Sequence, residues 1–199
     1  MTEIITMTNH GKLSEWHLAD PTTNSKGQKT CLLSCNQNPI TLHLGTKLRT
    51  RFGASSFDKT VDLPRKSLDF DISNQQHQLE FLKSVDAWAI DYIFENQQRF
   101  NFKKSMTREA IREAYKPLTS CYGTTTSIKT KVNVRGPRVC QCWDSHSSSI
   151  DLPEDGAWLE NLFDVQVAFT QLYFMNGLFG LTAETTALRV HPIQRVCPF

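Results

Sequence analysis

One stretch sets the architecture: it runs from Val165 to Thr182 and reads VQVAFTQLYFMNGLFGLT. Apolar, β-branched and aromatic residues fill both of its halves, a composition typical of β-strands. Between the halves stands Asn176-Gly177, the strongest two-residue signal for a tight hairpin turn. The stretch therefore predicts two long antiparallel strands, over residues 163–175 and 179–191.

Shorter runs in which apolar and polar residues alternate predict further strands upstream. They cover residues 40–44, 47–52, 67–72, 127–135 and 138–143. Two helices interrupt them, one over residues 76–98 with a single apolar stripe and one that begins at Thr107 and ends at Lys116-Pro117. Because the helices fall between blocks of strands, a parallel α/β sheet is disfavoured. We expect a mainly β fold with inserted helices (α+β), folded as a small barrel or sandwich.

The length of 199 residues suits one domain. Residues 1–38 are polar, with Trp16 as the only large anchor, and we expect a flexible or weakly structured N-terminal arm there. Residues 39–199 then form the domain, with a helical insertion near residues 76–116. No run of about 18 apolar residues occurs and the N-terminus lacks the features of a secretory signal, so neither a membrane span nor secretion is expected.

The net charge of +2 hides strong segregation along the chain. From Arg99 to Arg138 there are ten basic and two acidic residues, whereas from Asp144 to Asp164 there are six acidic residues and no lysine or arginine. This pattern favours a local anionic partner, and the alternative is a set of solvated faces that happen to cluster.

The six cysteines are irregularly spaced, which favours free thiols in a reducing intracellular compartment. Cys31 and Cys35 with Cys140 and Cys142 could supply four thiolates to zinc. Cysteines two apart on a strand, however, share one face and pack as small buried residues. Phosphate-binding glycine loops, Gly-x-Ser-x-Gly and HExxH are absent from the sequence. We expect no enzyme activity, no cofactor and no metal site.

Two predicted strands carry cations on one face. Period-two geometry places Lys129, Lys131, Asn133 and Arg135 outward, about 7 Å apart, a spacing that can follow a phosphate backbone. A second row, Lys47, Arg49 and Arg51, repeats the design, with Leu48, Thr50 and Phe52 on the opposite face. Aromatic residues beside these strands are candidates for stacking on bases. The predicted nucleic-acid contacts are Lys47, Arg49, Arg51, Lys103, Lys104, Tyr122, Lys129, Lys131, Asn133, Arg135, Arg138 and Trp143.

Several motifs, in order, resemble the OB-fold single-stranded-DNA-binding proteins of tailed phages and large nucleocytoplasmic DNA viruses. They are Arg51-Phe52-Gly53 with Phe57, residues 67–70, residues 81–86, Tyr115-Lys116-Pro117, residues 129–132 and the hairpin at 172–182. The resemblance implies an OB-like five-stranded Greek-key barrel over residues 39–199. It also implies a sequence-nonspecific role in viral DNA replication, recombination or repair, by coating and protecting single-stranded DNA and destabilising duplex.

The same resemblance implies further partners: the viral DNA polymerase or other replication proteins, and a second copy of the chain in a homodimer. For a viral protein it implies the host cytoplasm (a viral factory) or the nucleus. One departure concerns the acidic C-terminal tail of phage members, which the residues 194–199 do not reproduce. The acidic segment 144–164 is the candidate substitute. The alternatives are a structural or protein-interaction β domain of a virion or replication complex without direct DNA binding, and a zinc-dependent nucleic-acid enzyme.

Overall fold

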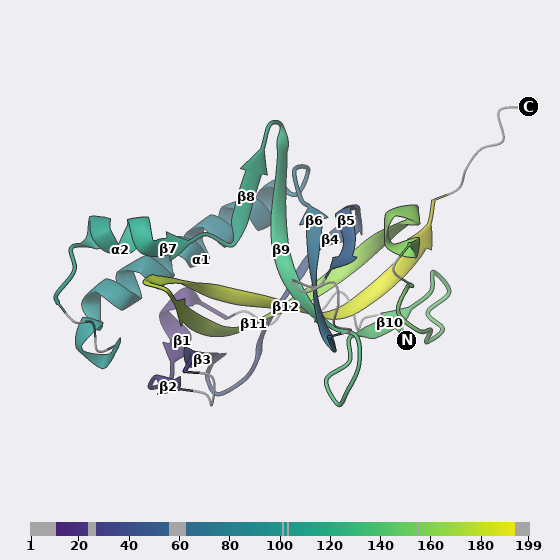
Figure 1. Ribbon diagram of the computed structural model, residues 1–199. Helices are drawn as coiled ribbons and strands as arrows, with labels where there is room; N and C mark the ends of the chain where they lie inside the picture. The colour runs from purple at the N-terminus through teal and green to yellow at the C-terminus, as the bar shows by residue number, and fades with distance from the viewer. Residues whose placement is uncertain are drawn as a thin grey trace, which may run out of the picture.

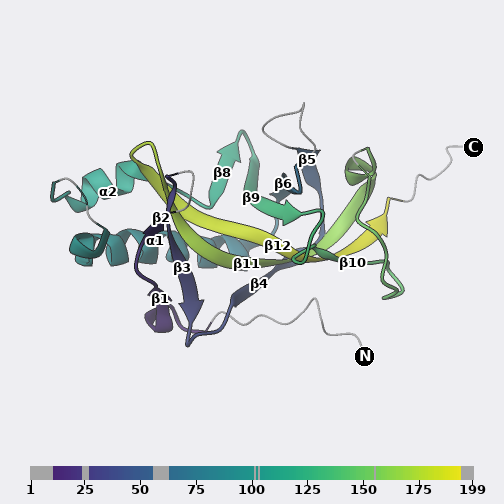
Figure 2. The same ribbon diagram turned by 60° about the horizontal axis from the view of Figure 1, so that its bottom comes forward.

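The computed structural model describes residues 11–23, 27–55, 63–100, 102, 104–154 and 156–193. These residues form a mainly β structure with two α-helices, as predicted (Figures 1 and 2). The strands are β1 (Trp16–Leu18), β2 (Thr22–Thr23), β3 (Lys29–Cys35), β4 (Ile40–Leu48), β5 (Thr50–Ser55), β6 (Arg65–Asp71), β7 (Tyr115–Lys116), β8 (Thr119–Tyr122), β9 (Thr125–Asn133), β10 (Gln141–Trp143), β11 (Asn161–Met175) and β12 (Leu178–Pro192). The helices are α1 (Gln76–Glu95) and α2 (Arg108–Ala114), and the short 3-10 turns are η1 (Leu13–Glu15), η2 (Gln97–Phe100) and η3 (Ala157–Glu160).

The long hairpin of β11 and β12 is confirmed. The two strands pair antiparallel along nearly their whole length. Asn176 and Gly177 both have positive φ, 52° and 78°, the backbone that a two-residue turn of this twist requires. Figures 1 and 2 show the hairpin running through the molecule, with the two α-helices at one end and β10 at the other.

The remaining strands join this hairpin in one mixed sheet of twelve strands, in the order β1-β3-β11-β12-β9-β6-β5. The strands β7, β9 and β10 pair parallel with β12, and β4 pairs antiparallel with β11. The order has two ends, so the sheet is open and the five-stranded barrel expected from the sequence is not confirmed. The mainly β class and the inserted helices are confirmed.

The helix α1 packs its predicted apolar stripe on the sheet: Leu82, Val85, Ala89 and Ile93 are fully buried. The helix α2 begins as predicted, because the Thr107 hydroxyl accepts a hydrogen bond from the Ala110 N–H at 3.2 Å. No helix among the described residues is long and apolar enough to cross a membrane.

The described part of the predicted N-terminal arm is structured. Its strand β3 pairs antiparallel with β11, and β1 pairs with β3. Trp16 is 3% exposed and its ring lies 5.3 Å from that of Trp88 on α1 and 5.7 Å from that of Phe169 on β11. An aromatic anchor of this size explains why so polar a segment is held on the core. The division of the chain at residue 38 stays a prediction.

Candidate nucleic-acid interface

The strand β9 presents its lysines as the alternation predicts. Lys129 and Lys131 are exposed, whereas Ile128, Thr130 and Val132 are buried. Asn133 is half-buried at the end of the strand. Arg135 is exposed but lies beyond β9, so it extends the row without sharing its strand geometry. Two of the four predicted contacts, Lys129 and Lys131, are therefore exposed on the outer face of β9.

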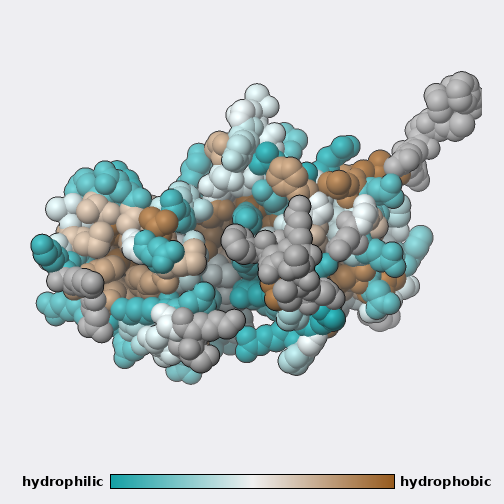
Figure 3. Space-filling model, in the orientation of Figure 1, coloured by the Kyte–Doolittle hydropathy of each residue, from teal (hydrophilic) through white to brown (hydrophobic). Residues whose placement is uncertain are grey.

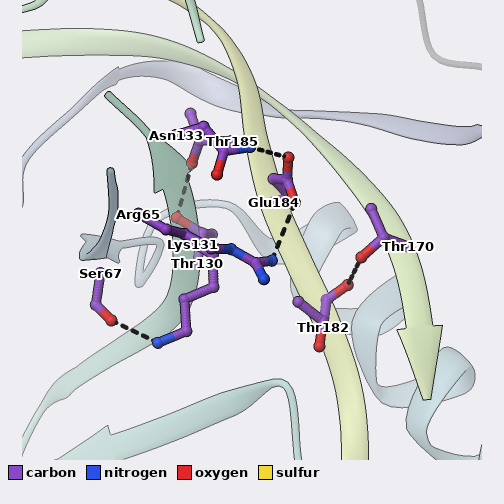
Figure 4. Close-up of polar contacts among 9 residues, drawn as sticks. All are labelled: Arg65, Ser67, Thr130, Lys131, Asn133, Thr170, Thr182, Glu184 and Thr185. Carbon is purple, nitrogen blue, oxygen red and sulfur yellow. Dashed lines mark hydrogen bonds and ion pairs between the residues drawn. The ribbon is translucent and has the colours of Figure 1, made fainter. Parts of the chain in front are cut away.

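A polar network holds part of this face in place (Figure 4). The Lys131 ammonium donates to Ser67 Oγ on β6 at 2.8 Å. Partial burial, the largest effect, and the neighbouring charges of Lys129 and Arg65 lower the pKa of Lys131. On β12, Glu184 pairs with Arg65 at 3.0 Å and accepts a hydrogen bond from the Asn133 amide at 2.6 Å. Arg65 and Asn133 are thus engaged by an acid, whereas Lys129 and Lys131 keep exposed side chains on the outer face.

The second basic row follows β4 and β5, and one residue departs from its predicted facing. Lys47 and Arg49 are exposed and Leu48 and Thr50 are buried, as expected. Phe52, predicted to share a face with the buried Leu48 and Thr50, is instead 59% exposed. The cause is a register shift between β5 and β6 after Thr50, a β-bulge that breaks the strict alternation of facings.

The bulge creates an aromatic cluster formed by Arg51, Phe52 and Tyr122. The Arg51 guanidinium carbon lies 5.3 Å from the centre of the Phe52 ring and 4.8 Å from the centre of the Tyr122 ring. Tyr122 is 69% exposed, although a ring of this kind usually buries most of its surface. The Arg51 Nη1 also donates to Ser127 Oγ at 3.5 Å. Cation–π attraction to Arg51 therefore holds two rings whose side chains remain mostly exposed.

The aromatic cluster and the lysines of β9 lie on the same side of the sheet. Phe52 pairs with Asp69 on β6, and Asp69 pairs with Lys129 on β9, so the three side chains form a row across neighbouring strands. Tyr122 ends β8, at the tip of the β8–β9 hairpin, which projects clear of the rest of the surface (Figures 1 and 3). We call Arg51, Phe52, Tyr122, Lys129 and Lys131 together the basic-aromatic face.

A buried carboxylate fixes the bend that leads into this face. Lys47 has a left-handed backbone, with φ of 51°, and its N–H donates to Asp164 Oδ1 at 3.0 Å. The other oxygen of Asp164 lies 3.0 Å from His191 Nε2 and 3.7 Å from Arg189 Nη1. Burial, the largest effect, lowers the pKa of the nearby His43 imidazole. Asp164 was not predicted, because its partners come together only when β11, β12 and β4 pair.

The other predicted contacts lie elsewhere. Lys104 is exposed ahead of α2, and Arg138 is exposed between β9 and β10. Trp143 is half-buried on β10, where it lines a pocket at the far end of the hairpin. Lys103 and, from the family motif, Phe57 lie outside the described residues.

The cysteines do not assemble a zinc site among the described residues. Cys31 and Cys35 lie on β3, which pairs with β11 at residues 171–174, near the hairpin turn. Cys140 precedes β10 and Cys142 lies on it, and β10 pairs with β12 at residues 187–189, far from that turn. Burial raises the pKa of the Cys31 thiol to about 11 and that of Cys142 to about 12, so both stay protonated. The described ranges hold no group of three or more potential metal ligands.

No protein-family model and no curated protein matches the sequence. Among solved structures, similarity is found to the "Single-stranded DNA-binding protein from bacteriophage Enc34", at 10% identity and a TM-score of 0.46 over 91% of this chain and 96% of that one. Its complex with ssDNA is similar at 8% identity and a TM-score of 0.42, over 89% and 97% of the two chains. Its C-terminal truncation is similar at 9% identity and a TM-score of 0.46, over 94% and 100%. Similarities this remote establish neither the fold nor the function of the present chain.

Proposed function

We propose that the protein binds single-stranded DNA on the basic-aromatic face, without sequence preference and without catalysing a reaction. The observation that carries this proposal is the pair of exposed rings, Phe52 and Tyr122, held around Arg51 on the same side of the sheet as Lys129 and Lys131. Flat apolar faces receive unstacked bases and the cations neutralise phosphates, the two requirements of a single-strand groove.

The binding free energy is the sum of contacts to phosphates and contacts to bases. Each lysine or arginine that meets a phosphate releases condensed counterions, so affinity falls as salt rises. Each base that stacks on a ring contributes about 1–3 kcal/mol, whatever its identity. Because the protein binds only the open strand, it shifts the melting equilibrium of a duplex by mass action.

The strand pairing supports an OB-like barrel as the finer description of this fold. Only Arg49 separates β4 from β5, and β4 pairs with β11 whereas β5 pairs with β6. Followed through the pairings, the path β5-β6-β9-β12-β11-β4 returns to the chain segment where it began. Counting β4 and β5 as one bent strand gives five strands, to which the short strands and helices are additions within residues 39–199.

The biological setting belongs to the same proposal. Coating and protection of single strands fits replication, recombination or repair of viral DNA, inside a cell, next to a DNA polymerase or a second copy of the chain. These roles rest on the sequence resemblance. The alternative, a protein-interaction β domain without DNA binding, draws support from a pocket beside β10 that has an apolar base.

Fluorescence titration tests the proposal, with a labelled oligo-dT and a duplex of equal length measured at two salt concentrations. We expect tighter binding of the single strand and a steep loss of affinity with salt. The double variant Lys129→Glu and Lys131→Glu should weaken binding and flatten the salt dependence, whereas Lys83→Glu, on the exposed side of α1, should do neither. Equal affinity for duplex and single strand, or no binding at low salt, would favour the protein-interaction alternative.

A further inference from the structure

A cavity of about 800 Å³ opens beside β10, at the end of the molecule remote from the α-helices. Cys140 and Cys142 and the buried Trp158 form its floor, and the exposed side chains of Val139 and Ile150 stand on its walls. Val139 is 46% exposed and Ile150 38%, in a protein that buries most of its large apolar residues. Figure 3 shows hydrophobic surface at this end of the molecule.

The walls of this β10 pocket are built by backbone hydrogen bonds. The Ile150 N–H donates to the Cys142 carbonyl at 3.0 Å, and Trp143 bridges to Ser149, so the loop after β10 folds back on the strand. The Asp144 carboxylate accepts hydrogen bonds from the N–H groups of His146 and Ser148, both at 2.8 Å, which closes the turn of that loop. A pocket with hydrogen-bonded walls is preformed and needs little ordering when it is filled.

The charges at the rim of the pocket favour a basic ligand over an anionic one. Asp151 and Glu154 are both exposed and line the pocket, and among the described lining residues Lys66 is the one cation. Two carboxylates repel a phosphate backbone and attract lysine or arginine. The thiols of the floor are neutral, because burial raises the pKa of Cys142 to about 12 and that of Cys140 further still. The pocket is therefore apolar at its base and acidic at its edge.

We propose that the β10 pocket binds a peptide segment of a protein partner, one that inserts a large apolar side chain between flanking basic residues. The apolar base takes the inserted side chain, and Asp151 and Glu154 take the basic residues. An anchor of this kind in a preformed pocket is how peptide segments obtain most of their binding energy.

The pocket and the basic-aromatic face lie on opposite sides of the sheet. Lys66 and Val132 are paired and face inward, toward the pocket side, whereas their neighbours Ser67 and Lys131 are paired and face outward. Partner peptide and single-stranded DNA can therefore be bound at the same time. The proposal does not depend on the proposed DNA binding, and the two can fail separately.

Fluorescence polarisation tests the proposal with a labelled pentapeptide that has one tryptophan between two pairs of lysines. We expect saturable binding, and a loss of about tenfold or more in the double variant Asp151→Lys and Glu154→Lys, since like charges then meet at the rim. Ile150→Glu, at an exposed position, should also abolish binding without unfolding the chain. Glu95→Lys on α1 is the matched charge control and should bind as the original protein does.

Several results would overturn the proposal that the β10 pocket binds a basic peptide. They are no binding, or equal binding of the peptide in which glutamates replace the lysines. Self-association that Ile150→Glu abolishes would assign the pocket to a second copy of the chain instead. Amide chemical shifts that move only at residues that do not line the pocket would place the peptide elsewhere. Failure of oligo-dT to bind, with peptide binding intact, would reject the proposed function and leave this inference standing.

Discussion

In the proposed function, bases of the DNA stack on the rings of Phe52 and Tyr122. Arg51 contacts both rings and holds them near each other. The two rings lie 5.3 and 4.8 Å from the Arg51 guanidinium and are both mostly exposed. Rings that are accessible yet fixed lose little conformational freedom when a base stacks on them. The cluster is thus ordered before DNA arrives.

Replacing either ring tests this role. Phe52→Ala or Tyr122→Ala should each weaken oligo-dT binding by about 1–3 kcal/mol, roughly 5- to 150-fold, because one stacked base is lost. The salt dependence should stay the same, because no cation is removed. Phe94→Ala, which truncates an exposed phenylalanine on α1, is the matched control. An affinity unchanged in both ring variants, measured by fluorescence titration, would remove the cluster from the binding site.

The Asp86 carboxyl makes the free energy of unfolding depend on pH. Burial raises the pKa of its carboxyl from 3.8 to about 6, against hydrogen bonds from the Tyr115 hydroxyl at 2.7 Å and the Leu118 N–H at 3.2 Å. The folded state therefore binds a proton that the unfolded state has released between these two pKa values. The contribution of Asp86 to the free energy of unfolding thus decreases as pH rises through this window and levels off above it.

We expect Asp86→Asn to remove this part of the pH dependence. Urea unfolding at pH 4 and at pH 7 measures it as the difference in the free energy of unfolding between the two pH values. The difference should be shifted in Asp86→Asn relative to the original protein, toward relatively greater stability at pH 7. Glu80→Gln, at an exposed position of α1, should leave it unchanged. Identical pH profiles for Asp86→Asn and the original protein would show that the carboxyl titrates normally.

The strands β9 and β5 differ in how well the alternation of apolar and polar residues predicts which side chains point outward. β9 pairs with β6 in unbroken register, so every second residue faces outward and Lys129 and Lys131 could be located from the sequence. β5 contains register shifts, so Phe52 turned to the surface against the pattern. Gly53, a glycine inside β5, is a sequence sign of a bulge, but the facing of Phe52 depends on the pairing with β6.

The bend between β4 and β5 depends on Asp164. Asp164→Ala would leave the Lys47 N–H without its acceptor and Arg189 and His191 without their carboxylate. We expect a loss of about 1–3 kcal/mol in the free energy of unfolding, the usual cost of a buried group left unpaired. Chemical denaturation measures it, with Asp151→Ala, an exposed carboxylate, as the control. A loss as small as that of the control would mean that the bend does not need Asp164.

For the complete chain, the sequence predicted the elements that have a long or regular pattern. The β11–β12 hairpin, α1 and the capped start of α2 were found from periodicity, the Asn176-Gly177 turn and Thr107. Strands of two or three residues, such as β1, β2 and β7, show no periodicity of their own and form by pairing with longer strands. The sheet is therefore larger than the sequence indicated.

The candidate site was predicted in part for the same reason. Arg51, Tyr122, Lys129 and Lys131 were named and lie on one face, but Phe52 was placed on the face opposite the cations. Trp143 was named for its basic neighbours in sequence, whereas in the fold it lines the acidic β10 pocket. Proximity along the chain does not fix which face of a sheet a side chain joins once loops and parallel pairings intervene.

Photo-crosslinking measures directly where the DNA lies. An oligo-dT that carries 5-iodouracil should, on irradiation, form bonds to the aromatic rings on which its bases stack, and mass spectrometry identifies the residues. We predict crosslinks at Tyr122 and Phe52, suppressed by excess unlabelled oligo-dT. Specific crosslinks confined to other residues, such as Trp143 in the β10 pocket, would contradict binding on the basic-aromatic face.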